Sequence, residues 1–202
     1  MKNYKSLYLL IFSLLLSISG VSTADNSPKS QLEGSVNKIL NILKQKDLDT
    51  TTRREKIREA INERFYFRAM SQQTLSRNWK KASPEQQKKF ISLFSKQLEQ
   101  AYIGRLEAYT DEKIDFLRVK MKNAKRAVVY TKIITKTADI PINYKLALKN
   151  GQWLIYDVVI EEVSLISNYR SSYKDIIKKS GIDSLLSQME KKLAENKTAN
   201  AG

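Results

Sequence analysis

The sequence predicts an α+β protein in which a curved antiparallel sheet of about four strands is surrounded by helices. Three observations predict this class. Apolar residues recur at helical spacing in the N-terminal half, the period shortens toward two from Asp111 onward, and helical spacing returns after Val163. The stretches with strand character are residues 113–121, 127–137, 140–149 and 152–161. Because the connections between them are short, we expect an antiparallel meander.

Three helices are expected first, at about residues 32–43, 52–64 and 65–75. In each of them apolar side chains recur at the spacing of one helix face. These inward residues are Leu32, Val36, Ile39, Leu40 and Leu43 in the first helix, Ile57, Ala60 and Ile61 in the second, and Phe67, Met70 and Leu75 in the third.

A long fourth helix should begin at Ser83. This serine fits an N-cap, Pro84 fits the first helical position, and Gln86 completes a capping box. The stripe that follows is wide and aromatic, and it consists of Phe90, Leu93, Phe94, Leu98, Ala101, Tyr102, Leu106 and Tyr109. A face of this composition predicts burial against other elements.

The third strand alternates between an apolar and a polar face. Its apolar face carries Ile142, Tyr144, Leu146 and Leu148, and its polar face carries Asn143, Lys145 and Lys149. The polar face should meet water, so replacing Lys145 should alter only surface charge. Asn150 and Gly151 form a two-residue hairpin signal that leads into the fourth strand.

The fourth strand is apolar on both faces, which predicts that both faces are covered. Strict alternation puts Leu154, Tyr156, Val158 and Ile160 on one face and Trp153, Ile155 and Val159 on the other. Asp157 interrupts the second face. No histidine or second carboxylate lies near it in the pattern, so we interpret it as a hydrogen-bonded structural residue and not as a catalytic base.

Two helices should complete the chain, separated near Gly181. Their inward residues are Ile166, Tyr169, Tyr173, Ile176 and Ile177 in the first, and Ile182, Leu185, Leu186, Met189 and Leu193 in the second.

The first 24 residues read as a secretory signal, with Lys2 and Lys5 before an apolar core and a small-residue site at Ser22-Thr23-Ala24. The apolar core is shorter than the roughly 20 residues that a membrane-spanning helix needs. We therefore expect cleavage after Ala24, export to the periplasm and a soluble mature chain. The expected organisation is a signal peptide at 1–24, a single domain at 25–197 and a polar tail at 198–202.

Cysteine and histidine are both absent from the sequence. Their absence excludes disulfides, thiolate nucleophiles, serine–histidine–aspartate triads and the usual zinc ligands, which leaves only a carboxylate pair or a serine–lysine arrangement for catalysis. We expect no enzyme activity and no metal. The formal charge of +15 favours anionic partners, namely lipid headgroups or acidic protein surfaces, over nucleic acid in an exported protein.

A series of motifs in order resembles the MlaC family, also called the toluene-tolerance auxiliary component of an ABC transport system. The series comprises Phe65-Tyr66-Phe67-Arg68-Ala69-Met70, Leu75-Ser76-Arg77-Asn78-Trp79, Ala82-Ser83-Pro84-Glu85-Gln86-Gln87, Phe90, Phe94, Tyr102, Leu106, Tyr109, Pro141-Ile142-Asn143-Tyr144, Trp153, Tyr156-Asp157-Val158, Val163-Ser164-Leu165-Ile166 and Asn168-Tyr169-Arg170. Three positions depart from the family pattern. Tyr66 stands where an acidic residue is common, and Ser76 and Glu162 stand where glycine is common.

The resemblance implies a periplasmic phospholipid carrier with an apolar cavity between sheet and helices, which maintains outer-membrane lipid asymmetry. Its implied partners are an inner-membrane ABC transporter complex with an MCE-type subunit and an outer-membrane lipoprotein/porin complex. Phospholipid would be the ligand, no cofactor would be needed, and the protein would act as a monomer. The residues expected around the acyl chains are Tyr102, Leu106, Ile142, Tyr144, Leu146, Tyr156, Val158, Val163 and Ile166. For each of these, ordinary core packing is the alternative.

Two other functions stay open from the residues alone. A basic periplasmic adaptor that binds anionic membranes would need the charge but no cavity, and lipid that copurifies without detergent would distinguish a carrier from it. A lipase or other hydrolase would need a nucleophile with an activating base, which the absence of histidine disfavours.

Overall fold

The computed structural model describes residues 26–108 and 113–199. Its N-terminal part contains α1 (Pro28–Lys44), α2 (Thr50–Arg64), α3 (Phe67–Leu75), the 3-10 helix η1 (Ser76–Lys80) and α4 (Pro84–Glu107). The sheet strands β1 (Lys113–Asn123), β2 (Arg126–Ile134), β3 (Asp139–Lys149), β4 (Gln152–Ile160) and β5 (Val163–Ser164) precede α5 (Leu165–Ala199). The expected signal peptide, Tyr109 and the end of the expected tail lie outside the described residues.

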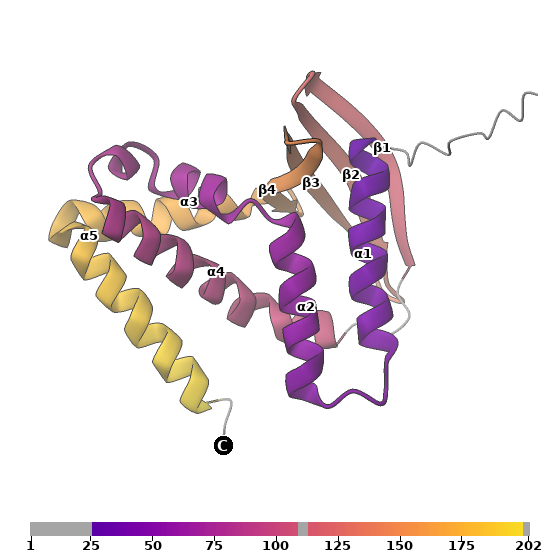
Figure 1. Cartoon of the computed structure of the whole chain (residues 1–202), viewed down its shortest axis with the longest axis horizontal. Helices are drawn as coiled ribbons and strands as arrows, with labels where there is room; N and C mark the ends of the chain where they lie inside the picture. Colours follow the sequence, from indigo (N-terminus) through magenta and orange to yellow (C-terminus); the bar gives the residue numbers. More distant parts are fainter. Residues whose placement is uncertain (1–25, 109–112, 200–202) are drawn as a thin grey trace, which may run out of the picture.

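The strands form one antiparallel sheet in the order β1-β2-β3-β4-β5, which confirms the predicted meander and adds one short strand (Figure 1). The turn between β3 and β4 is the predicted one. Asn150 and Gly151 have φ angles of 50° and 77°, the left-handed values that this tight hairpin requires.

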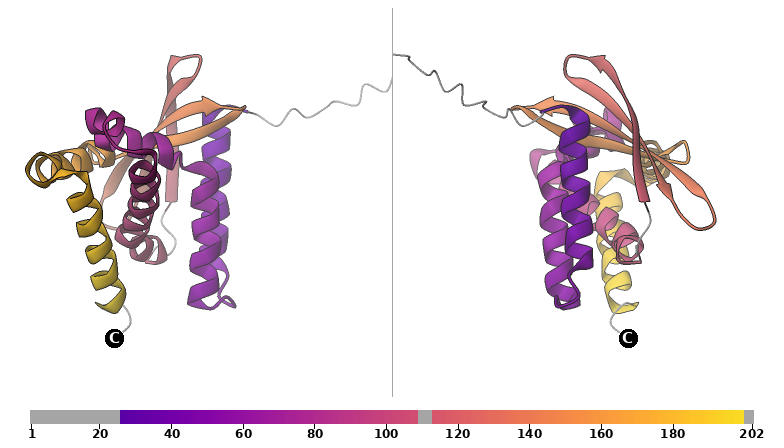
Figure 2. Two further views of the ribbon diagram at one scale, coloured as in Figure 1. Left: turned by 60° about the vertical axis from the view of Figure 1, so that its left-hand side comes forward. Right: turned by 90° about the vertical axis from the view of Figure 1, so that its right-hand side faces the viewer.

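Helix α1 lies across one face of the sheet, which we call the inner face (Figure 2). Its Leu32 is 1% exposed and joins a core cluster with the inward side chains of β2, β3 and β4. Polar contacts fix its N-terminal end, because Gln31 accepts a hydrogen bond from the Trp153 backbone at 2.9 Å and another from the Arg64 guanidinium at 2.9 Å. Arg64 also donates to the Trp153 carbonyl at 3.0 Å. These contacts tie α1 and the end of α2 to β4.

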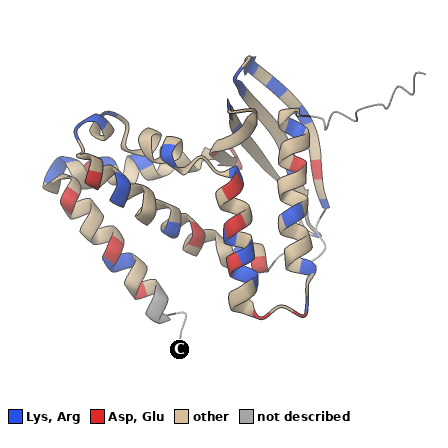
Figure 3. Cartoon of the chain, in the orientation of Figure 1, with Lys and Arg blue, Asp and Glu red and all other residues tan. Residues whose placement is uncertain are grey.

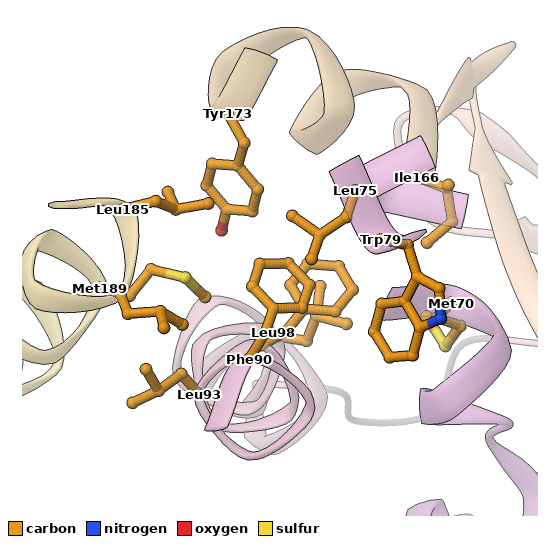
Figure 4. Close-up of a cluster of buried hydrophobic side chains, with 12 residues drawn as sticks. Met70, Leu75, Trp79, Phe90, Leu93, Leu98, Ile166, Tyr173, Leu185 and Met189 are labelled. Carbon is orange, nitrogen blue, oxygen red and sulfur yellow. The ribbon is translucent and has the colours of Figure 1, made fainter. Parts of the chain in front are cut away.

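A second core cluster joins α3, η1, α4 and α5 into a helical lobe beside the sheet (Figure 4). Phe90 and Phe94 are fully buried, stack on each other and meet Tyr173 edge-on. Helix α4 begins with the predicted capping box, in which Ser83 and Gln86 exchange side-chain and backbone hydrogen bonds. Helix α5 is two helices joined at Gly181, as predicted, because φ 78° and ψ 177° there are not helical. Among the described helices, none has the length and apolarity to cross a membrane.

Helices α1 and α2 form a hairpin whose far end packs against the C-terminal end of α4. Ile42, Ile57 and Ala60 are its buried residues, and Ile103 and Leu106 of α4 pack against them. Two ion pairs connect α2 to α4, from Arg54 to Glu107 at 2.7 Å and from Arg58 to Glu99 at 2.5 Å. The end of α4 is thereby held between the hairpin and the sheet.

The predicted faces of β4 need a correction, because the strand contains a bulge. Lys145 pairs with Asp157 and the next residue, Leu146, pairs with Ile155, so Tyr156 is an extra residue. A bulge reverses the alternation on one side of it. Trp153 and Ile155 therefore share the inner face with Val158 and Ile160, whereas strict alternation placed them on opposite faces.

Ser76 and Glu162, the two residues that stand in place of an expected glycine, both have a positive φ angle. Ser76 has φ 51° and Glu162 has φ 68°, in the region that residues with a Cβ adopt at a steric cost. Ser76 ends α3, and Glu162 lies in the turn between β4 and β5. Glycine would adopt a positive φ at either position without this cost. Glu162 is an exposed turn residue.

Candidate functional site

The candidate site is the apolar inner face of the sheet, which we call the inner wall. It is formed by inward side chains of four neighbouring strands, and α1 and α4 pack against it. Its members are Phe116, Val119, Ala127, Val129, Ile142, Tyr144, Leu146, Leu148, Trp153, Ile155, Val158 and Ile160. The register explains the grouping, because Ile142, Tyr144, Leu146 and Leu148 stand opposite Ile160, Val158, Ile155 and Trp153.

Tyr144 lies at the centre of the wall, between Val129 of β2 and Val158 of β4. Burial raises its pKa to about 12, because the ionised phenolate would lose solvation there. Its side chain nevertheless keeps partial solvent accessibility. Tyr144 is therefore a partly accessible member of a wall whose other members are largely buried. Both of its cross-strand neighbours on the wall are valines, so the Tyr144 side chain packs against apolar partners.

The C-terminal end of α4 packs against the inner wall. Tyr102 packs against both the wall and the core of the helical lobe, so it lies where the two meet. The Arg105 guanidinium lies 5.5 Å from the centre of the Tyr102 ring. Leu106, one turn further along, packs against the far end of the α1–α2 hairpin. Both side chains are partly exposed.

The structure divides the nine predicted lipid-facing residues into groups. Ile142, Tyr144, Leu146 and Val158 belong to the inner wall, and Tyr102 packs against it. Within this set, Leu146 is 0% exposed and Val158 is 6% exposed, whereas the other three are partly accessible. Accessible side chains can touch a ligand without opening the core. Leu146 has the burial of an ordinary core residue.

The other four predicted residues lie elsewhere. Leu106 belongs to the hairpin cluster and Ile166, 1% exposed, to the helical lobe. Tyr156 is the bulge residue on the opposite, outer face, where the Arg126 guanidinium lies 4.5 Å from its ring centre. Val163 in β5 is 58% exposed. The structure therefore does not bring Tyr156 and Val163 to the inner wall.

Sequence reasoning missed several wall residues, notably Phe116, Val119 and Ile160. Phe116 and Val119 are three positions apart, which does not fit strand alternation. They share a face because the register of β1 shifts between Phe116 and Arg118, making Leu117 an extra residue. Ile160 could have been found from the sequence, because it was on the same predicted face as Val158.

Asp157 is a buried polar anchor at the junction of sheet and helical lobe. It is 4% exposed, and one of its oxygens accepts from the Lys145 ammonium and the Ser164 hydroxyl, each at 2.8 Å. Its other oxygen accepts from the Ile166 backbone at 3.2 Å, in the first turn of α5. The interpretation of Asp157 as a hydrogen-bonded structural residue is confirmed. The prediction for Lys145 is wrong, because this lysine neutralises a buried carboxylate and is more than surface charge.

Two hollows lie away from the wall. One of about 580 Å³ separates α1 from α2 and is lined largely by polar residues such as Asn37, Gln45 and Glu59. The other, of about 460 Å³, lies between α4 and the two halves of α5. Neither is lined by a residue of the inner wall. The wall is the better candidate for an apolar ligand, since all its members are aliphatic or aromatic side chains. In the described part of the chain, no cluster of acidic residues has the makeup of a metal site.

Comparisons with known proteins agree with the fold and the motifs. The family model described as MlaC protein matches residues 33–191. The chain is 28% identical over 122 residues to the intermembrane phospholipid transport system binding protein MlaC of Haemophilus influenzae, covering 58% of this chain and 57% of that protein. It is 28% identical over 105 residues to the toluene tolerance protein ttg2D of Pseudomonas putida, covering 52% and 49%. The chain thus spans about half the length of these curated relatives.

A solved structure gives the same fold. The phospholipid-binding protein from Ralstonia solanacearum, solved in complex with a phospholipid, superposes with a TM-score of 0.77 at 19% sequence identity. The match covers 84% of this chain and 98% of the other. It confirms the predicted α+β class with a curved antiparallel sheet.

Proposed function

This chain belongs to the MlaC family, and from that premise we propose that it is a periplasmic phospholipid carrier that holds acyl chains against the inner wall. The observation that carries the proposal is the partial accessibility of apolar wall residues, above all Ile142 and Tyr144, in an otherwise closed core. The relatives support phospholipid as the ligand. One of them is the binding protein of an intermembrane phospholipid transport system, and a protein with the same fold was solved in complex with a phospholipid.

The energetics of transfer favour a surface of this kind. Removing two acyl chains of about 15 methylenes each from water is worth on the order of 24 kcal/mol, at about 0.8 kcal/mol per methylene. A bilayer already supplies this stabilisation, so a carrier must offer comparable dry apolar surface. It must also do so without opening a tightly packed core, since each new cavity costs several kcal/mol. Partly accessible wall residues meet both requirements better than fully buried ones such as Leu146.

The finer parts of the proposal concern route and processing. We propose that the mature domain begins after Ala24 and includes residues 25–197. It would move phospholipid between an outer-membrane lipoprotein/porin complex and an inner-membrane ABC transporter with an MCE-type subunit. No catalytic step is proposed, because the sequence contains neither histidine nor cysteine.

The test compares two carboxylate insertions at neighbouring positions of β3. Ile142→Glu adds a charge to the wall, whereas Asn143→Glu adds the same charge to the outer face. Burying a carboxylate among acyl chains costs several kcal/mol. We expect phospholipid per protein, measured by extraction and phosphate assay after detergent-free purification, to fall at least about tenfold in Ile142→Glu and to stay unchanged in Asn143→Glu.

Circular dichroism melting shows whether each variant is folded. A folded Ile142→Glu protein with its full phospholipid content would contradict the proposal. If that variant does not fold, Ile142→Thr makes a smaller polar change at the same place and should lower lipid content in a folded protein. Wild-type protein that carries no lipid by native mass spectrometry would also contradict the carrier function.

A further inference from the structure

The hairpin of β1 and β2 ends in a basic tip, which we define as residues 117–126. It contains Arg118, Lys120, Lys122, Lys125 and Arg126, and it contains no acidic residue. Every residue of the tip except Val119 is exposed. Blue bands mark these cations along the upper part of the hairpin in Figure 3. None of the five forms an ion pair with a described residue, so their charge is available to a partner.

The same ten residues expose two large apolar side chains. Leu117 is 56% exposed and Met121 is 48% exposed, and the described part of the chain has only one other large hydrophobic residue of this kind, Val163. A single exposed apolar residue needs no explanation. Two of them among five cations form a combination typical of surfaces that insert apolar side chains between lipid headgroups.

The fold explains both exposures. Leu117 is the extra residue of the β1 bulge, on a strand whose outer edge has no neighbour in the sheet. Met121 pairs with Ala127, whose side chain belongs to the inner wall. The apolar surface of the wall therefore continues along β1 to the exposed tip. The arginines are held on the outer face, with Arg118 lying 3.7 Å from the Tyr130 ring centre and Arg126 over Tyr156.

We propose that the tip docks on the surface of an anionic lipid bilayer, with Leu117 and Met121 in the headgroup layer and the lysines around them. The composition favours lipid over an acidic protein. Lysine is depleted at protein interfaces and aromatic residues are enriched there, yet the tip has three lysines and no aromatic residue. Flexible lysines suit headgroups, which are mobile phosphates without fixed geometry. This docking is independent of where acyl chains are held.

The test measures sedimentation of the mature protein with vesicles of 30% phosphatidylglycerol in phosphatidylcholine, against pure phosphatidylcholine. The tip variant is Lys122→Gln with Lys125→Gln. Its matched control, Lys178→Gln with Lys179→Gln, has the same net charge but changes exposed residues of α5. Each lysine near an anionic surface contributes about fivefold to partitioning, so the tip variant should bind about thirtyfold more weakly. The control should change less than about twofold.

A second pair tests the apolar contribution. Met121→Ser should weaken vesicle binding severalfold, whereas Val163→Ser, at the other exposed position, should not. The proposal is overturned if the wild-type protein binds both vesicle types equally, or if the tip variant and the control variant lose vesicle binding to the same extent. It is also overturned if the tip can be cross-linked to an acidic protein while the wild-type protein does not bind the vesicles. Lipid content of the purified variants is a separate readout, so a failure here would leave the carrier proposal standing.

Discussion

Replacing Asp157 with asparagine should lower the free energy of unfolding by about 2–3 kcal/mol. Breaking a buried ion pair typically costs about 3–5 kcal/mol when the remaining charge stays buried. Here the remaining partner, Lys145, has 35% of its side chain exposed and can turn to water, which reduces the loss. Asparagine also keeps an acceptor for either Ser164 or Ile166. The loss should therefore fall below the full range but exceed that of a surface pair, which is about 1 kcal/mol at most.

Urea denaturation followed by circular dichroism and by fluorescence of Trp79 and Trp153 measures this loss. Because Asp157 holds the first turn of α5, hydrogen exchange at Ile166 should also become faster in the variant. Lys145→Gln should cost about 1–2 kcal/mol, since it leaves Asp157 with two hydrogen-bond donors. The double variant should cost less than the sum of the two. The argument would be refuted if Asp157→Asn lowered the free energy of unfolding by less than about 0.5 kcal/mol. It would also be refuted if the loss in the double variant equalled the sum of the losses in the two single variants.

Two further predictions concern the wall and a turn. Burial raises the pKa of Tyr144 from about 10 to about 12, so its contribution to stability is fully present below pH 10 and is lost as the pH rises toward 12. Urea denaturation between about pH 9 and about pH 11.5, a range that includes the ordinary pKa of tyrosine, should show a shallower decline of stability in Tyr144→Phe than in wild type. Identical slopes would argue against burial. Glu162→Gly should raise the free energy of unfolding by about 1 kcal/mol, because φ 68° is strained for glutamate. An unchanged or lower denaturation midpoint would show that Glu162 makes a compensating contact.

Local signals in the sequence determined most of the fold. The capping box at Ser83, the hairpin turn at Asn150 and Gly151, and the break at Gly181 each act through a few neighbouring residues, and each was predicted correctly. Strand alternation in β3 was also correct, because Ile142, Tyr144, Leu146 and Leu148 do share one face. The strand order followed from short connections alone.

Features that depend on pairing between strands could not be predicted in this way. The bulges at Leu117 and Tyr156 change which side chains face inward, and they depend on the neighbouring strand. For the same reason the ion pair between Lys145 and Asp157 was not foreseen. The candidate site was therefore predicted correctly along β3 but only in part along β4. Tyr102 was also expected beside the acyl chains, and its contact with the wall joins α4 to strands that are distant from it in the chain.

The bulge in β4 has a consequence for insertions and deletions. Val158 and Ile155 face the wall on either side of an outward pair, Asp157 and Tyr156. If Tyr156 were deleted, the remaining strand would alternate regularly, and Trp153, Ile155, Val158 and Ile160 would all still face inward. The chain could thus lose one residue here without moving any wall side chain, giving up only the contact with Arg126. Deleting a residue from a regularly alternating part of a strand moves the side chains that follow it to the opposite face of the sheet. β4 can therefore vary in length at Tyr156, where its alternation is already interrupted.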